Sequence, residues 1–149
     1  MTAAIASRVP KLQYAALPWR KSKRGLEILL VTTLTTQRWI VPKGWPLKNL
    51  TPGECAAYEA LEEAGVIGTV ARKALGSFTY EKRKKSGKFV PCRIDVYPME
   101  VVKRRRKWVE RDMRKSRWCS CAKAIALVSD AGLQELIAKF AGLAKAAAP

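Results

Sequence analysis

The sequence predicts one domain of the α/β or α+β class, in which strands and helices pack in layers around a single core. Three observations support this class: short apolar runs recur along the chain, two segments have helical periodicity, and neither a repeat nor a linker interrupts them. The 149 residues suffice for one buried core, and hydrophobic residues make up 48% of them. We therefore expect residues 1–149 to form a single domain.

Several segments are typical of β-strands. Residues 26–33 (LEILLVTT) form a continuous run of Leu, Ile, Val and Thr, as a buried strand does. Residues 42–46 (PKGWP) contain two prolines and a glycine, which predicts a loop. The remaining predicted strand regions are residues 38–41, 66–81 and 89–102, with a basic turn at residues 82–88 between the last two.

Two segments are predicted to be helices. The first begins at Thr51, which can form a capping box with Glu54, and it ends at Gly65. The second covers residues 122–147, where apolar side chains recur at helical spacing. The predicted core face of the first helix is Ala57, Ala60, Leu61 and Ala64, and that of the second is Leu133, Leu136, Ile137, Phe140 and Leu143.

The two ends of the chain are expected to lie outside the packed core. We interpret residues 1–20 as an N-terminal lead-in and residues 144–149 as a tail that frays. No apolar run approaches the roughly 20 residues that span a bilayer, and residues 1–10 lack the apolar segment of a signal peptide. We therefore predict a cytoplasmic location and no membrane partner, and we leave open whether the protein is a monomer or a homodimer.

The composition excludes several kinds of chemistry. The sequence contains no histidine, so it cannot form a Ser-His-Asp or Cys-His nucleophile pair or a histidine-ligated metal site. Its four cysteines (Cys55, Cys92, Cys119 and Cys121) form no CxxC pair, and we interpret them as reduced thiols. Any bound metal should therefore be a hard cation held by oxygen ligands, which suits Mg²⁺.

The formal net charge of +17 predicts a polyanionic partner. Nucleic acid and a phosphate-rich small molecule are the two classes that we retain. A solubilising surface would also be rich in lysine, but 29 basic residues against 12 acidic residues is an unusual margin.

Three glutamates cluster on the first predicted helix. Glu59, Glu62 and Glu63 are spaced at i, i+3 and i+4 and therefore share one face. Like charges at this spacing repel by a few tenths of a kcal/mol per pair, and the negative end of the helix dipole lies close to the last two. A divalent cation would relieve this repulsion, whereas a solvated acidic face is the alternative interpretation.

The surroundings of these glutamates resemble the signature of the Nudix (MutT-like) hydrolases. Gly44 is followed at the right spacing by residues 58–66 (YEALEEAGV), which match the Arg-Glu-aliphatic-x-Glu-Glu-x-Gly-aliphatic part of the family motif. Two positions depart from the motif, because Leu50 replaces its first glutamate and Tyr58 replaces its arginine. Residues 108–125 are similar to the diphosphoinositol polyphosphate phosphohydrolase branch, and the resemblance covers residues 26–140.

The resemblance implies an α/β/α sandwich with a mixed sheet and a metal-dependent hydrolase. It implies that Gly44, Glu59, Glu62 and Glu63 bind Mg²⁺, or alternatively Mn²⁺, and that a glutamate accepts the proton of the attacking water. For this distal role we favour Glu110, although the same residue could simply pair with Arg111 or Arg114. Tyr58 offers only a hydroxyl where the family has an arginine, so its effect on the glutamates is open.

The basic residues are expected to bind the substrate's phosphates. The candidates are Lys21, Arg24, Arg38, Lys43, Lys82 and Arg106. The predicted activity is hydrolysis of a pyrophosphate bond in a diadenosine polyphosphate, a diphosphoinositol polyphosphate or a nucleoside triphosphate. Two alternatives remain: removal of pyrophosphate from an RNA 5′ end, and a non-catalytic nucleic-acid-binding protein on a decayed Nudix scaffold.

Overall fold

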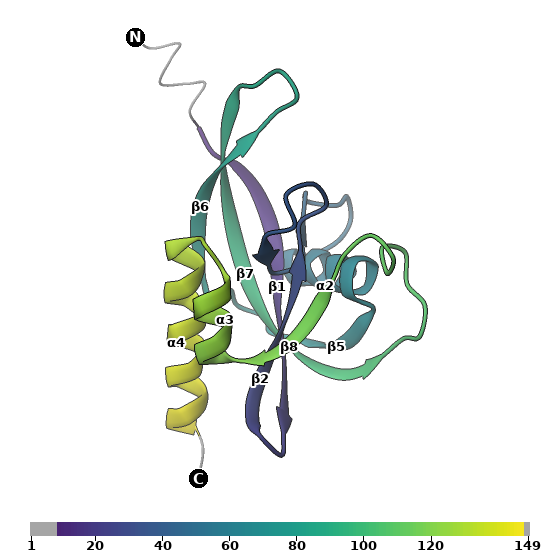
Figure 1. The fold of residues 1–149 in the computed structure, drawn as a ribbon, viewed down its shortest axis with the longest axis vertical. Coiled ribbons are helices and arrows are strands. Elements are labelled where there is room, and N and C mark those ends of the chain that lie inside the picture. The colour runs from purple at the N-terminus through teal and green to yellow at the C-terminus, as the bar shows by residue number, and fades with distance from the viewer. Residues whose placement is uncertain (1–8, 148–149) are drawn as a thin grey trace.

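A computed structural model describes residues 9–147, and within this part of the chain eight strands form one mixed sheet that three helices cover (Figure 1). The strands are β1 (Lys11–Ser22), β2 (Gly25–Thr32), β3 (Trp39–Ile40), β4 (Lys43–Gly44), β5 (Val66–Val70), β6 (Gly76–Arg83), β7 (Phe89–Arg104) and β8 (Ser116–Ser120). The helices are α2 (Pro52–Ala64), α3 (Cys121–Leu127) and α4 (Ala131–Ala147).

Two long strands, β1 and β7, form the centre of the sheet. They pair in parallel from Lys11 opposite Cys92 to Trp19 opposite Glu100, whereas every other strand pair of the described chain is antiparallel. The early part of β1 also pairs with β4 and its end with β2, while β7 pairs first with β6 and then with β5. The strand order is therefore β3-β2-β1-β7-β5, with β8 paired to β2.

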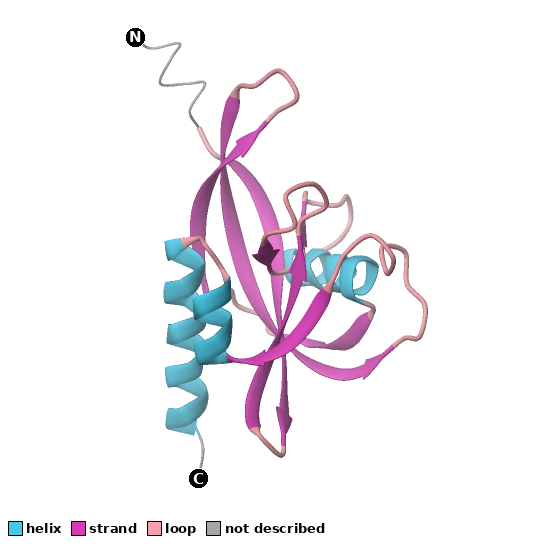
Figure 2. Cartoon of the chain, viewed as in Figure 1, coloured by secondary structure: helices cyan, strands magenta, loops and turns pink. Residues whose placement is uncertain are grey.

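Helices cover both faces of the sheet, as Figure 2 shows, with α3 and α4 on one side and α2 on the other. On the α4 side, Gly132 packs against Phe78, and the Trp19 and Phe140 rings lie 5.9 Å apart. The largest fully buried side chains include Leu17, Ile28, Leu29, Ile94, Met99, Leu133 and Ile137. The expected α/β/α sandwich with a mixed sheet is thus confirmed.

The N-terminal region differs from the sequence prediction. Residues 11–20 of the expected lead-in belong to β1, a central strand in which Ala15, Ala16 and Leu17 are fully buried. Polar and apolar residues do not alternate there, because the strand is covered on both faces. Residues 1–8 lie outside the described part of the chain.

The short strand β4 lies inside the predicted loop at residues 42–46. Gly44 pairs with Tyr14, and Lys43 pairs with Ala15. Pro42 and Pro46 still bound this segment, so β4 extends over only two residues.

The single C-terminal helix that we predicted is in fact two helices. Val128 has extended backbone angles and ends α3. The side-chain amide of Gln134, on α4, donates to the carbonyls of Ile125 and Val128 at 3.2 and 2.9 Å, which satisfies the end of α3 at the break. The expected frayed tail is helical through Ala147, and residues 148–149 lie outside the described chain.

Helix α2 begins and ends at the predicted residues. The Thr51 side chain accepts a hydrogen bond from the Glu54 backbone amide, and the Glu54 side chain accepts one from the Thr51 amide. Gly65 ends the helix in the left-handed conformation, at φ +70°. Across residues 9–147, no helix is both long and apolar enough to cross a bilayer.

Candidate active site

The buried face of α2 differs by about one residue from the predicted one. Ala56, Ala60 and Ala64 are fully buried, whereas Ala57 and Leu61 are only partly buried. This rotation turns Glu63 inward, where it is 5% exposed and is the only buried carboxylate of the described chain. Burial of a carboxylate is unfavourable unless it is paired or protonated. Because Glu63 is buried, it does not belong to a solvated acidic face.

Glu59 and Glu63 form a carboxyl pair near Gly44, the last residue of β4. Their side chains are hydrogen-bonded to each other. The Glu59 carboxyl also lies against Gly44, and a Cβ at that position would overlap it. A residue without a side chain is therefore required at position 44 for the carboxyl to reach the strand backbone.

Glu62 does not join this pair. Its carboxylate accepts a hydrogen bond of 2.9 Å from the hydroxyl of Tyr58, one turn earlier on the exposed side of α2. The predicted cluster of three glutamates is therefore divided into an inner pair and a residue held outward. Among the described residues, no three acidic or cysteine side chains converge on one point as metal ligands do.

Glu110 approaches the inner pair from the segment between β7 and β8. Its backbone amide donates to the carbonyl of Glu62 at 3.0 Å. Arg114 joins the two regions, because its guanidinium lies 2.7 Å from Glu110 and 3.7 Å from Glu63 and donates to the Thr32 carbonyl at 2.8 Å. Glu110 thus pairs with Arg114, as the simpler interpretation expected, and it also lies near the glutamate pair, so its role as the proton acceptor stays a prediction.

The electrostatics of this group favour a bound proton or cation. Burial raises the pKa of Glu63 to about 8, and although Arg114 opposes the change, the charges of Glu59 and Glu110 add to it. Burial also raises the pKa of Glu59, whereas its hydrogen bond to Glu63 opposes the change. Near neutral pH, the metal-free Glu59–Glu63 pair therefore keeps a proton. A divalent cation bound at the same place would balance the negative charge of the pair instead.

A pocket of about 440 Å³ is connected to these carboxyl groups through Arg114, which contacts Glu63 and Glu110. Arg114 lines it, and so does Lys43, whose amine donates to the Tyr80 hydroxyl at 2.9 Å. Burial lowers the pKa of Lys43, while the charge of Glu63 opposes this change. The other lining residues are Thr33, Leu34, Thr35, Thr36, Arg38, Ile40, Tyr80, Glu81, Lys82 and Arg83. Five cations in one pocket suit several phosphate groups.

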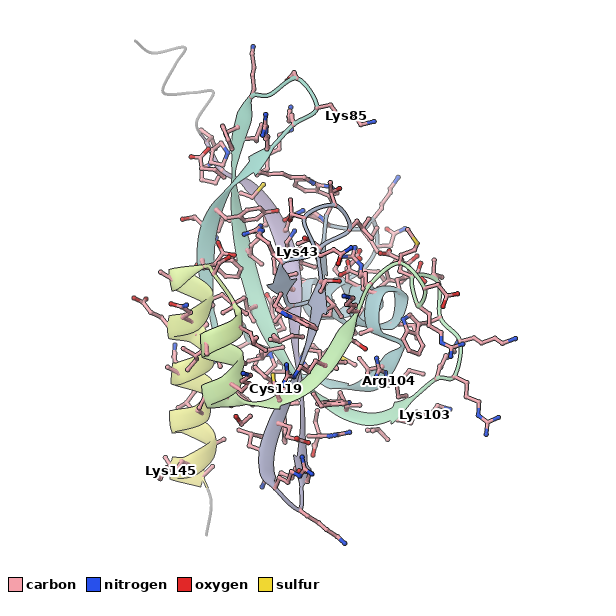
Figure 3. The ribbon with its side chains drawn as sticks, viewed as in Figure 1. Lys43, Lys85, Lys103, Arg104, Cys119 and Lys145 are labelled. Carbon is pink, nitrogen blue, oxygen red and sulfur yellow. The ribbon has the colours of Figure 1, made fainter. Side chains whose placement is uncertain are left out.

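The predicted phosphate-binding residues divide into two sets. Arg38, Lys43 and Lys82 all line this pocket. Lys21 and Arg24 lie instead at the β1–β2 hairpin, where Lys21 lines a separate cavity with Lys145 of α4. Arg106 is exposed in the segment after β7 and does not line the pocket. Figure 3 shows Lys43 near the centre of the molecule and Lys145 near the far end of α4.

Trp108 has a structural role that the sequence analysis did not predict. Its ring packs on Gly65 at the end of α2, and the guanidinium groups of Arg104 and Arg111 lie 4.7 and 5.8 Å from the ring centre. Arg104 also donates to the Ala64 carbonyl at 3.0 Å, so the segment after β7 is fixed to the end of the helix. The juxtaposition of a helix-ending glycine and a distant tryptophan cannot be read from spacing alone.

Comparisons with known proteins place these features in a family. The chain is 30% identical over 120 residues to Nudix hydrolase 12, mitochondrial, of Arabidopsis thaliana, covering 77% of this chain and 58% of the relative. It is 34% identical over 108 residues to human diphosphoinositol polyphosphate phosphohydrolase 3-beta, covering 70% and 62%. A binary complex of C. elegans Ap4A hydrolase has a similar structure, with a TM-score of 0.68, 20% identity and coverage of 91% and 98%.

The fold, the position of Gly44 and the helix that carries the glutamates define a Nudix-type domain. The chain belongs to the Nudix hydrolase family. No family model matches the sequence. The chain spans less than two thirds of the length of the first curated relatives that it matches.

Proposed function

We propose that this protein is a divalent-metal-dependent pyrophosphohydrolase that acts on a phosphate-rich substrate. The substrates that we favour are a diadenosine polyphosphate, a diphosphoinositol polyphosphate or a nucleoside triphosphate. The observation that carries this proposal is the inner carboxyl pair, Glu59 and Glu63, which Arg114 connects to a pocket lined by five cations. The names of one curated relative, diphosphoinositol polyphosphate phosphohydrolase 3-beta, and of one structural neighbour, Ap4A hydrolase, refer to such substrates, which supports this choice.

The donor atoms of this region suit Mg²⁺ or Mn²⁺. They are carboxyl oxygens, with neither imidazole nor sulfur among them, and burial and mutual repulsion make their metal-free charges costly. Glu59 and Glu63 would hold the metal, together with the Gly44 carbonyl, and Glu62 would join them if it left Tyr58. A bound divalent cation would neutralise phosphate charge and make water more acidic.

The side chains of the chain would perform the other parts of the reaction. Arg38, Lys43 and Lys82 would bind phosphate oxygens, while Arg114 would stabilise charge beside the reacting phosphorus. A water oxygen would form a bond to phosphorus, and the bond from phosphorus to the bridging oxygen would break. Glu110 would accept the proton of this water, and the bridging oxygen would leave with the departing phosphate.

Phosphate release from diadenosine tetraphosphate, measured with Mg²⁺ and then with Mn²⁺, tests this proposal. We expect Glu63→Gln and Glu59→Gln each to lower kcat by at least 100-fold, because each removes a charged ligand. Glu135→Gln is the matched control, since this exposed residue lies on α4, away from the pocket. A wild type that hydrolyses neither a diadenosine polyphosphate nor a diphosphoinositol polyphosphate nor a nucleoside triphosphate would refute the proposal.

The second candidate function is removal of pyrophosphate from an RNA 5′ end. Lys82 and Arg83 favour it, because they line the pocket and belong to a hairpin that carries further cations. The non-catalytic alternative would be supported if wild type and both glutamine variants released no phosphate but bound RNA. The cytoplasmic location remains a prediction.

A further inference from the structure

The β6–β7 hairpin is a strongly basic projection of the described chain. It extends beyond the body of the molecule, and Lys85 lies at its outer end (Figure 3). Residues 82–88 contain five cations and no acidic residue, and all seven are exposed. The five are Lys82, Arg83, Lys84, Lys85 and Lys88.

The backbone of this hairpin fixes the positions of its cations. Lys84 donates its amide to the Lys88 carbonyl at 2.8 Å, and Gly87 donates to the Lys84 carbonyl at 2.9 Å. Gly87 has a φ of +87°, which a side chain would strain, so the tight turn depends on this glycine. The backbone that carries these cations is therefore a tight turn closed by hydrogen bonds.

The cations of the hairpin extend from the pocket to the turn at its tip. Lys82 and Arg83 line the pocket, whereas the three lysines of the turn lie outside it. The positive charge of the hairpin therefore continues past the pocket, which suits a polyanion with regularly spaced phosphates.

Exposed aromatic rings accompany these cations. Phe89 is 61% exposed and lies directly opposite Arg83 in the hairpin register, so both side chains share a face. On the other side, the amine of Lys82 lies 4.9 Å from the ring centre of Trp45, which is 42% exposed. Exposed rings beside cations are the elements with which proteins stack bases and hold the backbone of single strands.

We propose that the β6–β7 hairpin binds single-stranded nucleic acid, with its lysines on the phosphates and Phe89 stacked on a base. A bilayer surface is the less favoured partner, because the hairpin presents a single large apolar side chain rather than an apolar stripe. The proposal goes beyond the hydrolase activity and does not depend on it.

The salt dependence of binding tests the lysines. The probe is a fluorescein-labelled oligouridine of about 20 nucleotides, and the readout is fluorescence anisotropy at several salt concentrations. Replacing Lys84, Lys85 and Lys88 by serine should reduce the slope of log K against log salt by about 2, at about 0.7 per phosphate contact on single strands. The matched control replaces Lys21, Lys23 and Arg24, three exposed cations of the β1–β2 hairpin, and should leave the slope unchanged.

The Phe89→Ala variant tests the stacking contact. It should weaken oligouridine binding about tenfold without a change in the salt slope. Equal slopes for the two triple variants would overturn the proposal, as would binding to vesicles of anionic phospholipid without binding to the oligonucleotide. The lysine triple variant should keep the wild-type kcat/KM on diadenosine tetraphosphate, so a failure of the hydrolase proposal would be seen separately.

Discussion

Replacing Glu63 by glutamine should stabilise the metal-free protein while it abolishes hydrolysis. A group whose folded pKa is raised stabilises the fold fully below its unfolded pKa, and this contribution is lost as the pH rises through the folded value. Glu63 has an ordinary pKa of 4.5 and a folded pKa of about 8, so wild type should lose stability across this window. Glutamine resembles the protonated carboxyl and cannot ionise, so the variant should not show this loss.

The magnitude follows from the pKa change. A rise from 4.5 to about 8 corresponds to on the order of 3 to 5 kcal/mol, at about 1.4 kcal/mol per unit. In the presence of EDTA at pH 8, we expect Glu63→Gln to unfold at a temperature higher by about 6 to 20 °C, at about 2 to 4 °C per kcal/mol for a chain of this size. Added Mg²⁺ should stabilise wild type at pH 8 and should have little effect on the variant.

Calorimetric melting between pH 5 and pH 8.5, with EDTA and with Mg²⁺, provides the measurement. The Glu135→Gln control should follow wild type under every condition, because Glu135 is exposed on α4. The reasoning would be refuted by a Glu63→Gln variant that is less stable than wild type at pH 8 without metal. A wild-type stability that rises steadily over this pH range would refute it as well.

Three further predictions concern the surroundings of the glutamates. Tyr58→Phe removes the 2.9 Å hydrogen bond that holds Glu62 away from the inner pair and should raise kcat/KM about 3- to 10-fold in a phosphate-release assay, whereas an unchanged rate would mean that the hydroxyl does not restrain Glu62. Gly65→Ala should lower the free energy of unfolding by at least 1 kcal/mol in urea titrations, because a Cβ there meets the Trp108 ring and the φ of +70° disfavours a side chain. Lys43→Met should lower kcat at least tenfold by removing the pocket's most buried amine, and steady-state kinetics that showed only a higher KM would contradict this expectation.

Local signals explain why both ends of α2 could be predicted. The cap at Thr51, the reciprocal contact of Glu54 and the left-handed stop at Gly65 involve neighbours in sequence, and all three are present. The resemblance also identified Gly44 as a position close to the glutamates, and the contact with Glu59 agrees with that placement.

Tertiary contacts decided what the sequence could not. Helical spacing places Glu59, Glu62 and Glu63 on one face, but Tyr58 holds one of them outward and burial draws another inward. Similarly, Lys21 precedes the first predicted strand, yet the β1–β2 hairpin carries it away from the pocket. The spatial role of Arg114, which joins Glu63 to Glu110, depends on the path of a segment about 50 residues further along the chain.

The parallel pairing of β1 with β7 has a consequence for how the protein folds. The paired residues are about 80 positions apart, as Lys11 and Cys92 illustrate. During synthesis, the apolar strand β1 emerges from the ribosome long before β7, so it remains without its parallel partner for that time. Closing so long a loop is entropically slow, so we expect a late, rate-limiting step in which these two strands meet. Until then, a chaperone or an early hairpin with β2 would have to shield that strand from aggregation.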